Sequence, residues 1–219
     1  MTDVGENCRR ILDRIHSAAA KGGRDPSSVQ LIAVTKKVSV DKIREAVAAG
    51  ISHIGENRLQ EALPKREALA DLSLTWHFIG HLQTNKAKKA VEEFDWIQCV
   101  DRPELAEKLN LSATKALRVL IEVKLHDEPA KSGIAEPQLA GFIEQFSRWE
   151  RLELRGLMAI PPLFENPQDV RPYFRRLRGL AEEHGLRELS MGMSNDFEVA
   201  IEEGATMVRV GTALFGERK

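Results

Sequence analysis

The chain has 219 residues, a length that suits one α/β barrel better than two small domains. Its 32 Lys and Arg residues nearly balance 33 Asp and Glu residues, so the composition predicts no nucleic-acid partner and no membrane-surface partner. No apolar run approaches the roughly 18–20 residues of a membrane-spanning helix, and the first residues do not resemble a signal peptide. Cys8 and Cys99 match no metal or redox spacing. We therefore expect ordinary thiols in a reducing, cytoplasmic compartment.

The predicted elements begin with a helix over Val4–Lys21, in which Ile11, Leu12 and Ile15 share one face. Apolar runs of strand length then alternate with segments of helical period. The first run, near Val34, is almost continuously apolar, as expected for a strand buried on both faces. The predicted strands are Val29–Thr35, Ser52–Gly55, Leu74–Gly80, Trp96–Val100, Leu117–Lys124, Glu153–Ala159, Arg187–Met191 and Thr206–Val210.

Helix signals lie between these strands. Ser39 is expected to cap a helix that stops at Gly50. Pro103 and Pro137 stand where the first turns of two later helices are expected, because a helix needs no N–H there. The last predicted helix is Phe197–Glu203. Alternation of strands and helices over the whole length predicts a parallel sheet.

Eight strands in about 200 residues predict closure into a single (β/α)8 barrel, residues 1–219, with an extra N-terminal helix. An open, doubly wound sheet is the alternative. That fold usually carries a glycine-rich turn after its first strand, and the turn here is Thr35-Lys36-Lys37-Val38. The barrel is therefore favoured.

The turns after the last two strands predict a phosphate site, which is their usual role in this fold. Gly192 and Gly211 let backbone N–H groups approach a phosphate closely, and Ser194 and Thr212 add hydroxyl donors. A helix expected to begin near Asn195 points its positive end to the same place. Either turn alone is explained as well by a helix cap or a tight turn. The two together, at one rim, favour phosphate.

Two cations are the other candidates at this rim. Alternation along the last strand sends Val208 and Val210 outward and Arg209 into the barrel mouth, where a buried guanidinium needs a ligand or an ion pair with a group such as Glu56. Lys36 ends the most apolar strand, so it is either a surface group or a nucleophile whose neutral amine could form a Schiff base. Spacing alone leaves open whether Lys36 or Lys37 faces inward.

His77 and His81 are four residues apart, which imitates a helical metal-binding pair. We place them on a strand and its following loop, where that spacing does not converge. A structural role is therefore favoured over a metal site.

The sequence resembles the pyridoxal-phosphate homeostasis protein family, whose members are single-domain relatives of the alanine racemase barrel. The resemblance covers nearly the whole chain in the expected order. It rests on Ala33-Val34-Thr35-Lys36, Gly55-Glu56-Asn57-Arg58, Trp76-His77-Phe78-Ile79-Gly80-His81-Leu82-Gln83, Lys131-Ser132-Gly133, Gly156-Leu157-Met158, Ser190-Met191-Gly192-Met193-Ser194 and Met207-Val208-Arg209-Val210-Gly211-Thr212-Ala213.

The resemblance implies pyridoxal 5′-phosphate (PLP) as the cofactor, held as a Schiff base on Lys36 rather than on Lys37. It implies that Arg209 faces the pyridine nitrogen and that Asn57 and His81 lie beside the ring. Ser194, Gly211 and Thr212 would bind the phosphate. Lys124 stands where the family pattern has Asn.

An Arg at the pyridine nitrogen keeps that nitrogen unprotonated and weakens PLP as an electron sink. A racemase of this fold also needs a second base, a tyrosine from outside the barrel in the two-domain enzymes. The one tyrosine, Tyr173, lies in a predicted outer helix, and we expect no second domain. We therefore expect a PLP carrier or buffer that hands PLP to apo PLP-dependent enzymes.

Two alternatives remain open. One is a weak PLP-dependent racemase or lyase that uses Lys36 and a rim residue such as His81 as its bases. The other is a barrel enzyme acting on a phosphorylated sugar without PLP. We expect a monomer, because the predicted helix faces are charged.

Overall fold

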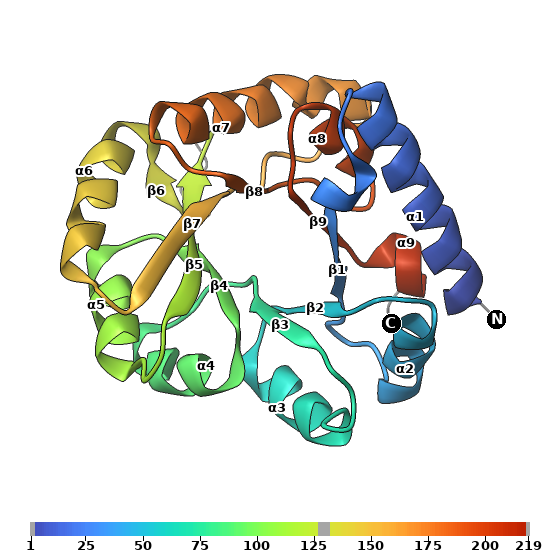
Figure 1. Ribbon diagram of the computed structural model, residues 1–219, viewed down its shortest axis with the longest axis horizontal. Helices are drawn as coiled ribbons and strands as arrows, with labels where there is room; N and C mark the ends of the chain where they lie inside the picture. Colours follow the sequence, from blue (N-terminus) through green and yellow to red (C-terminus); the bar gives the residue numbers. More distant parts are fainter. Residues whose placement is uncertain (1–2, 127–131, 218–219) are drawn as a thin grey trace.

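The strands of the chain close into a parallel barrel (Figure 1). The computed structural model describes residues 3–126 and 132–217. Within these residues the strands pair in the order β4-β3-β2-β1-β9-β8-β7-β5, and the pairing of β4 with β5 closes the ring of eight. The predicted (β/α)8 barrel is therefore confirmed. Its strands are β1 (Gln30–Val34), β2 (His53–Glu56), β3 (Thr75–Phe78), β4 (Trp96–Val100), β5 (Leu117–Lys124), β7 (Leu152–Met158), β8 (Glu188–Ser190) and β9 (Met207–Val210).

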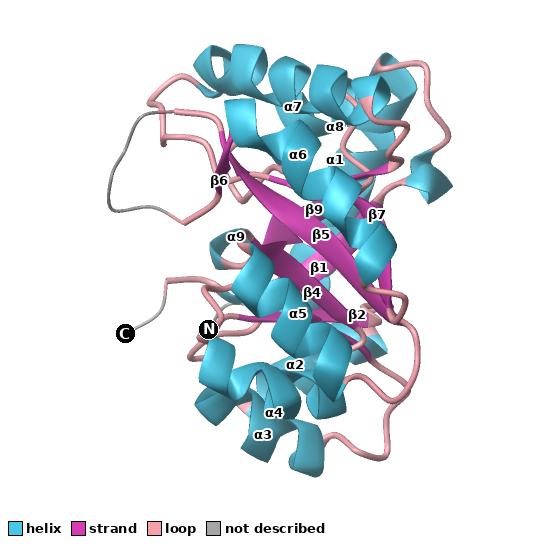
Figure 2. Ribbon diagram, turned by 90° about the vertical axis from the view of Figure 1, so that its left-hand side faces the viewer, coloured by secondary structure: helices cyan, strands magenta, loops and turns pink. Residues whose placement is uncertain are grey.

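Helices surround the ring of strands, and the side view shows them on both sides of the barrel (Figure 2). The extra N-terminal helix has the predicted bounds and packs beside the last helices of the chain, α8 and α9. The helices are α1 (Val4–Lys21), α2 (Val40–Ala48), α3 (Leu59–Ala68), α4 (Ala87–Glu93), α5 (Pro103–Ser112), α6 (Leu139–Glu144), α7 (Arg171–Glu183), α8 (Phe197–Glu202) and α9 (Thr212–Phe215). No helix among the described residues is both long and apolar enough to cross a membrane.

Several local predictions need correction. The bounds of β4 and β5 are as predicted, whereas the other predicted strands differ from the observed ones by one or two residues at their ends. A two-residue strand, β6 (Ile134–Ala135), pairs with β5 outside the ring and was not predicted, because so short a strand leaves no alternation pattern. Ser39 occupies the N-cap position of α2, but its side chain makes no capping hydrogen bond. The last predicted helix, Phe197–Glu203, is observed as Phe197–Glu202, so it begins at Phe197 rather than near Asn195.

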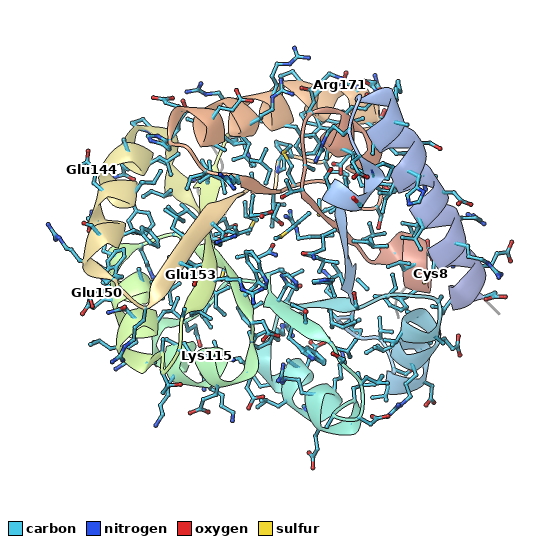
Figure 3. All side chains as sticks on the ribbon, viewed as in Figure 1. Cys8, Lys115, Glu144, Glu150, Glu153 and Arg171 are labelled. Atoms are coloured by element: carbon cyan, nitrogen blue, oxygen red, sulfur yellow. The ribbon has the colours of Figure 1, made fainter. Side chains whose placement is uncertain are left out.

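Side chains fill the space that the strands enclose (Figure 3). The outward-facing Val208 and Val210 of β9 are fully buried, as the alternation predicts. Barrel interiors are usually filled by bulky branched residues. This interior is instead partly polar, with a set of buried side chains that comprises His77, Gln98, Glu122, Ser190 and Arg209.

Candidate functional site

A cleft of about 360 Å³ opens at the carboxyl ends of β1, β2, β8 and β9. The sequence-predicted site residues line it, with the exception of Gly192 and His81. The lining side chains are Val34, Lys36, Asn57, Ile79, Ile160, Leu163, Met193, Ser194, Asn195, Asp196, Arg209, Gly211 and Thr212. The volume is in the range of sites for small organic ligands, and apolar walls with a few polar groups are typical of such sites.

Arg209 forms the inner wall of this cleft. Its side chain is 4 % exposed; Nη1 donates to Ser190 Oγ at 2.5 Å and Nη2 donates to the carbonyl of Ala159 at 2.9 Å. Burial lowers the pKa of Arg209 to about 10, and the carboxylates of Glu122 and Asp196 oppose that shift. The guanidinium therefore stays cationic at neutral pH. The ion pair with Glu56 that we considered does not form, because Glu56 pairs with Lys65 at 2.6 Å.

The turns after β8 and β9 meet at Ser194. The backbone N–H groups of Gly211 and Ala213 both donate to Ser194 Oγ, each at 3.3 Å. Gly192 has φ +89°, and a Cβ there would lie 2.5 Å from the Cβ of Ala200, so a larger residue has no room. N–H groups that converge on a hydroxyl oxygen can also bind an oxygen of a phosphate.

Lys36 and Asn57 form the opposite wall. Lys36 follows β1 after one intervening residue, Thr35, and is exposed at the cleft. Just below it, Lys65 Nζ donates to the backbone carbonyl of Thr35 at 2.6 Å and to the carboxylate of Glu56 at 2.6 Å, which anchors the end of β1. The side-chain oxygen of Asn57 is buried and has no hydrogen-bond partner within residues 3–126 and 132–217. A buried acceptor without a donor is unusual and indicates that a ligand or water supplies one.

Glu122 at the end of β5 was missed by the sequence analysis. It is 6 % exposed, accepts a hydrogen bond from Ser132 Oγ at 3.1 Å and interacts with the charges of Asp101 and Arg209. Burial raises its pKa to about 7. Alternation could have found it, since Glu122 breaks the apolar run of its strand as Arg209 does.

His81 is exposed and does not line the cleft. His77 is fully buried and hydrogen-bonds within the barrel, so the two rings do not converge. In the part of the chain that the structure describes, no three His, Cys, Asp or Glu side chains gather as metal ligands would. Lys131 of the Lys131-Ser132-Gly133 motif lies outside the described residues.

The fold and the position of the cleft define a barrel of the alanine racemase type. The family described as alanine racemase, N-terminal domain, matches residues 8–219. An alanine racemase from Corynebacterium glutamicum superimposes with a TM-score of 0.71 at 20 % identity over 96 % of this chain and 61 % of that one, which shows the shared fold.

Relatives with higher sequence identity define the family of this chain more narrowly. The pyridoxal phosphate homeostasis protein of Aquifex aeolicus is 47 % identical over 98 % of both chains. That of Pseudomonas aeruginosa is 45 % identical over all of this chain and 97 % of the relative. The structure of PipY from Synechococcus elongatus with PLP bound has a TM-score of 0.83 and 44 % identity over 94 % of this chain and 100 % of that one. This chain belongs to the family of pyridoxal phosphate homeostasis proteins.

Proposed function

We propose that this chain binds PLP as a Schiff base on Lys36 and serves in intracellular PLP homeostasis as a carrier or buffer, with residues 1–219 as one PLP-binding domain. One observation carries the proposal: a single cleft brings together an amine at Lys36, a cation at Arg209 and the converging N–H groups of Gly211 and Ala213. Two relatives that are named pyridoxal phosphate homeostasis proteins, and the structure of PipY with PLP bound, support this proposal.

The residues fit the parts of PLP. The N–H groups at Ser194, with the hydroxyl of Thr212 at the same rim, suit the phosphate. The unpartnered oxygen of Asn57 suits a donor beside the ring. An unprotonated pyridine nitrogen accepts a hydrogen bond, and Arg209 suits it because a guanidinium can only donate. His81 stays a proposed neighbour of the ring only if its loop moves inward.

The surroundings of the cleft favour a role as a PLP carrier rather than as a catalyst. PLP supplies an electron sink for carbanions when its ring nitrogen is protonated, and a cationic Arg209 disfavours that protonation. Tyr173 lies in α7, and its ring centroid is 5.7 Å from that of Phe164 and 6.4 Å from that of His126. It does not line the cleft. The described cleft therefore offers no tyrosine as a second base.

The first test is the visible spectrum of PLP-loaded protein before and after borohydride. Wild type should show a band that borohydride bleaches, with PLP mass fixed to the peptide that contains Lys36. Lys36→Ala should lose the band, and Lys37→Ala should keep it as the matched control. A band that survives in Lys36→Ala would refute the attachment site.

The carrier role needs a second test. Loaded wild type should restore activity to an apo PLP-dependent enzyme, while borohydride-reduced protein should not, because its PLP is fixed covalently. The alternative, a weak racemase or lyase, predicts multiple turnover of a free amino acid that Lys36→Ala abolishes. Such turnover would replace the carrier role.

A further inference from the structure

A chain of polar side chains begins at Arg209 and runs down through the barrel interior. Arg209 Nη1 donates to Ser190 Oγ at 2.5 Å, and Ser190 Oγ donates to Gln98 Oε1 at 2.7 Å. Gln98 Nε2 then lies 3.0 Å from Nδ1 of His77. All four side chains are at most 4 % exposed, so each bond lies away from solvent.

The chain continues to the opposite end of the barrel. Nε2 of His77 lies 3.0 Å from Nδ1 of His53, and Nε2 of His53 lies 2.8 Å from Nε2 of the Gln30 side chain. Gln30 and His53 are the first residues of β1 and β2, whereas Arg209 is near the end of β9. The chain therefore connects the cleft to the amino-terminal face of the barrel.

The chemistry of the first member sets the direction of all the bonds. A guanidinium can only donate, so Ser190 Oγ accepts from Arg209 and donates onward to the oxygen of Gln98. The nitrogen of Gln98 must then donate to Nδ1 of His77. A neutral imidazole that accepts at Nδ1 carries its proton on Nε2, which donates to Nδ1 of His53. His53 then carries its own proton on Nε2, so the Gln30 amide must turn over to present its oxygen there as the acceptor.

The surroundings favour neutral imidazoles. His77 is fully buried and stacks on Trp96 with ring centroids 5.7 Å apart. Burial, then His53 and the cation of Arg118, hold the pKa of His77 well below its usual value. The pKa of His53 is lowered by burial and Arg118, and only Asp95 opposes the shift.

We propose that Ser190, Gln98 and His77 are positioning residues that hold the Arg209 guanidinium in the orientation the cofactor ring requires, an inference that rests on the proposed PLP function. The physical reason is the fixed bond direction. With His77 in place, the Gln98 amide presents its oxygen to Ser190. Without His77 the amide can turn over, so that Ser190 Oγ loses the oxygen to which it donates and can rotate, which loosens its bond with the guanidinium of Arg209.

The bond direction is tested first on ligand-free protein. Nitrogen-15 NMR of labelled histidine should show His77 as the neutral tautomer protonated on Nε2 at pH 7.5, with its signals assigned by their loss in His77→Gln. A proton on Nδ1, or a charged ring, would overturn the inference.

The positioning role is tested on loaded protein. His77→Leu, which can neither accept nor donate, should weaken PLP binding by about tenfold, the equivalent of roughly one lost buried hydrogen bond, and should shift the visible band or its pH profile. His77→Gln, whose amide can accept from Gln98 and donate to His53, should stay within about twofold of wild type. Ser190→Ala should behave like His77→Leu and serves if the leucine variant does not fold.

Ile32→Val is the control, because it removes a methylene from the fully buried Ile32 of β1 and leaves the polar chain intact. A wild-type spectrum and affinity in both His77→Leu and Ser190→Ala would overturn the inference and leave the PLP function standing. Equal losses in His77→Leu and His77→Gln would assign His77 to packing instead. A wild type with no bleachable band would overturn the proposed function and the inference together.

Discussion

At the scale of single residues, the buried carboxyl group of Glu122 links stability to pH. Its folded pKa is about 7, above the value of 4.5 for an exposed Glu, so the folded state binds the proton more tightly. The contribution of Glu122 to the free energy of unfolding is therefore present at low pH and is lost as pH rises through 7. Glu122→Gln should match wild type near pH 5 and exceed it at pH 8 by up to about 3 kcal/mol in urea denaturation.

Glu153→Gln is the control for this prediction, because Glu153 is an exposed Glu on the neighbouring strand β7. It should change stability little at either pH. An unchanged pH dependence in Glu122→Gln would show that Glu122 does not titrate in the folded protein as its burial implies.

His77 should produce the opposite pH dependence. Its folded pKa lies well below 6.5, so the unfolded state binds the extra proton first as pH falls. The free energy of unfolding should therefore fall below pH 6.5, by about 1.4 kcal/mol per pH unit for each such imidazole, and recover as pH rises. His77→Gln should have the shallower slope between pH 6.5 and 5.5. Equal slopes in the two proteins would contradict the neutral buried ring.

At the scale of elements, glycine allows β7 and β8 to approach each other. Gly156 pairs with Glu188, and a Cβ at Gly156 would lie 1.9 Å from the carbonyl oxygen of Glu188. Gly156→Ala should therefore destabilise the barrel by about 2–3 kcal/mol or more in urea denaturation. Gly179→Ala lies within α7, and no described atom outside that stretch of helix comes within 4 Å of the added methyl, so it should instead stabilise by about 0.5–1 kcal/mol. Similar effects of the two substitutions would contradict this packing argument.

Alternation and apolar runs predicted the elements well. A parallel strand buried on both faces has a nearly continuous apolar run, and a helix between such strands has apolar residues at helical spacing. Arg209 was placed inside the barrel by the same alternation. The partners of buried groups could not be predicted in this way. Glu56 pairs with Lys65 of α3, and only the register of β1 against β2 brings Thr35 to the same carboxylate. Such contacts depend on three-dimensional packing rather than on spacing.

At the scale of the whole molecule, ion pairs join the last helices to the first and support closure between β9 and β1. Arg14 of α1 makes two 2.8 Å bonds to Glu198 of α8, and Lys21 of α1 pairs with Glu202 of α8. Arg171, labelled in Figure 3 at the start of α7, pairs with Glu202 and Glu203. Because β1 and β9 also lead into the cleft, the contacts that hold the first and last elements together keep Lys36 near Arg209.

Ligand binding should therefore stabilise the whole barrel. PLP at 100 times its Kd should add about 2.7 kcal/mol to the free energy of unfolding, and each kcal/mol should raise Tm by about 2–4 °C for a chain of this size. Pyridoxal, which lacks the phosphate, should raise Tm less than PLP at the same concentration, because it leaves the N–H groups of Gly211 and Ala213 unused. Gly211→Pro, which removes one of those donors, should reduce the difference between the two ligands. Equal shifts with PLP and pyridoxal in wild type would show that the turns after β8 and β9 do not bind phosphate, and would leave Lys36, Asn57 and Arg209 to hold the ligand.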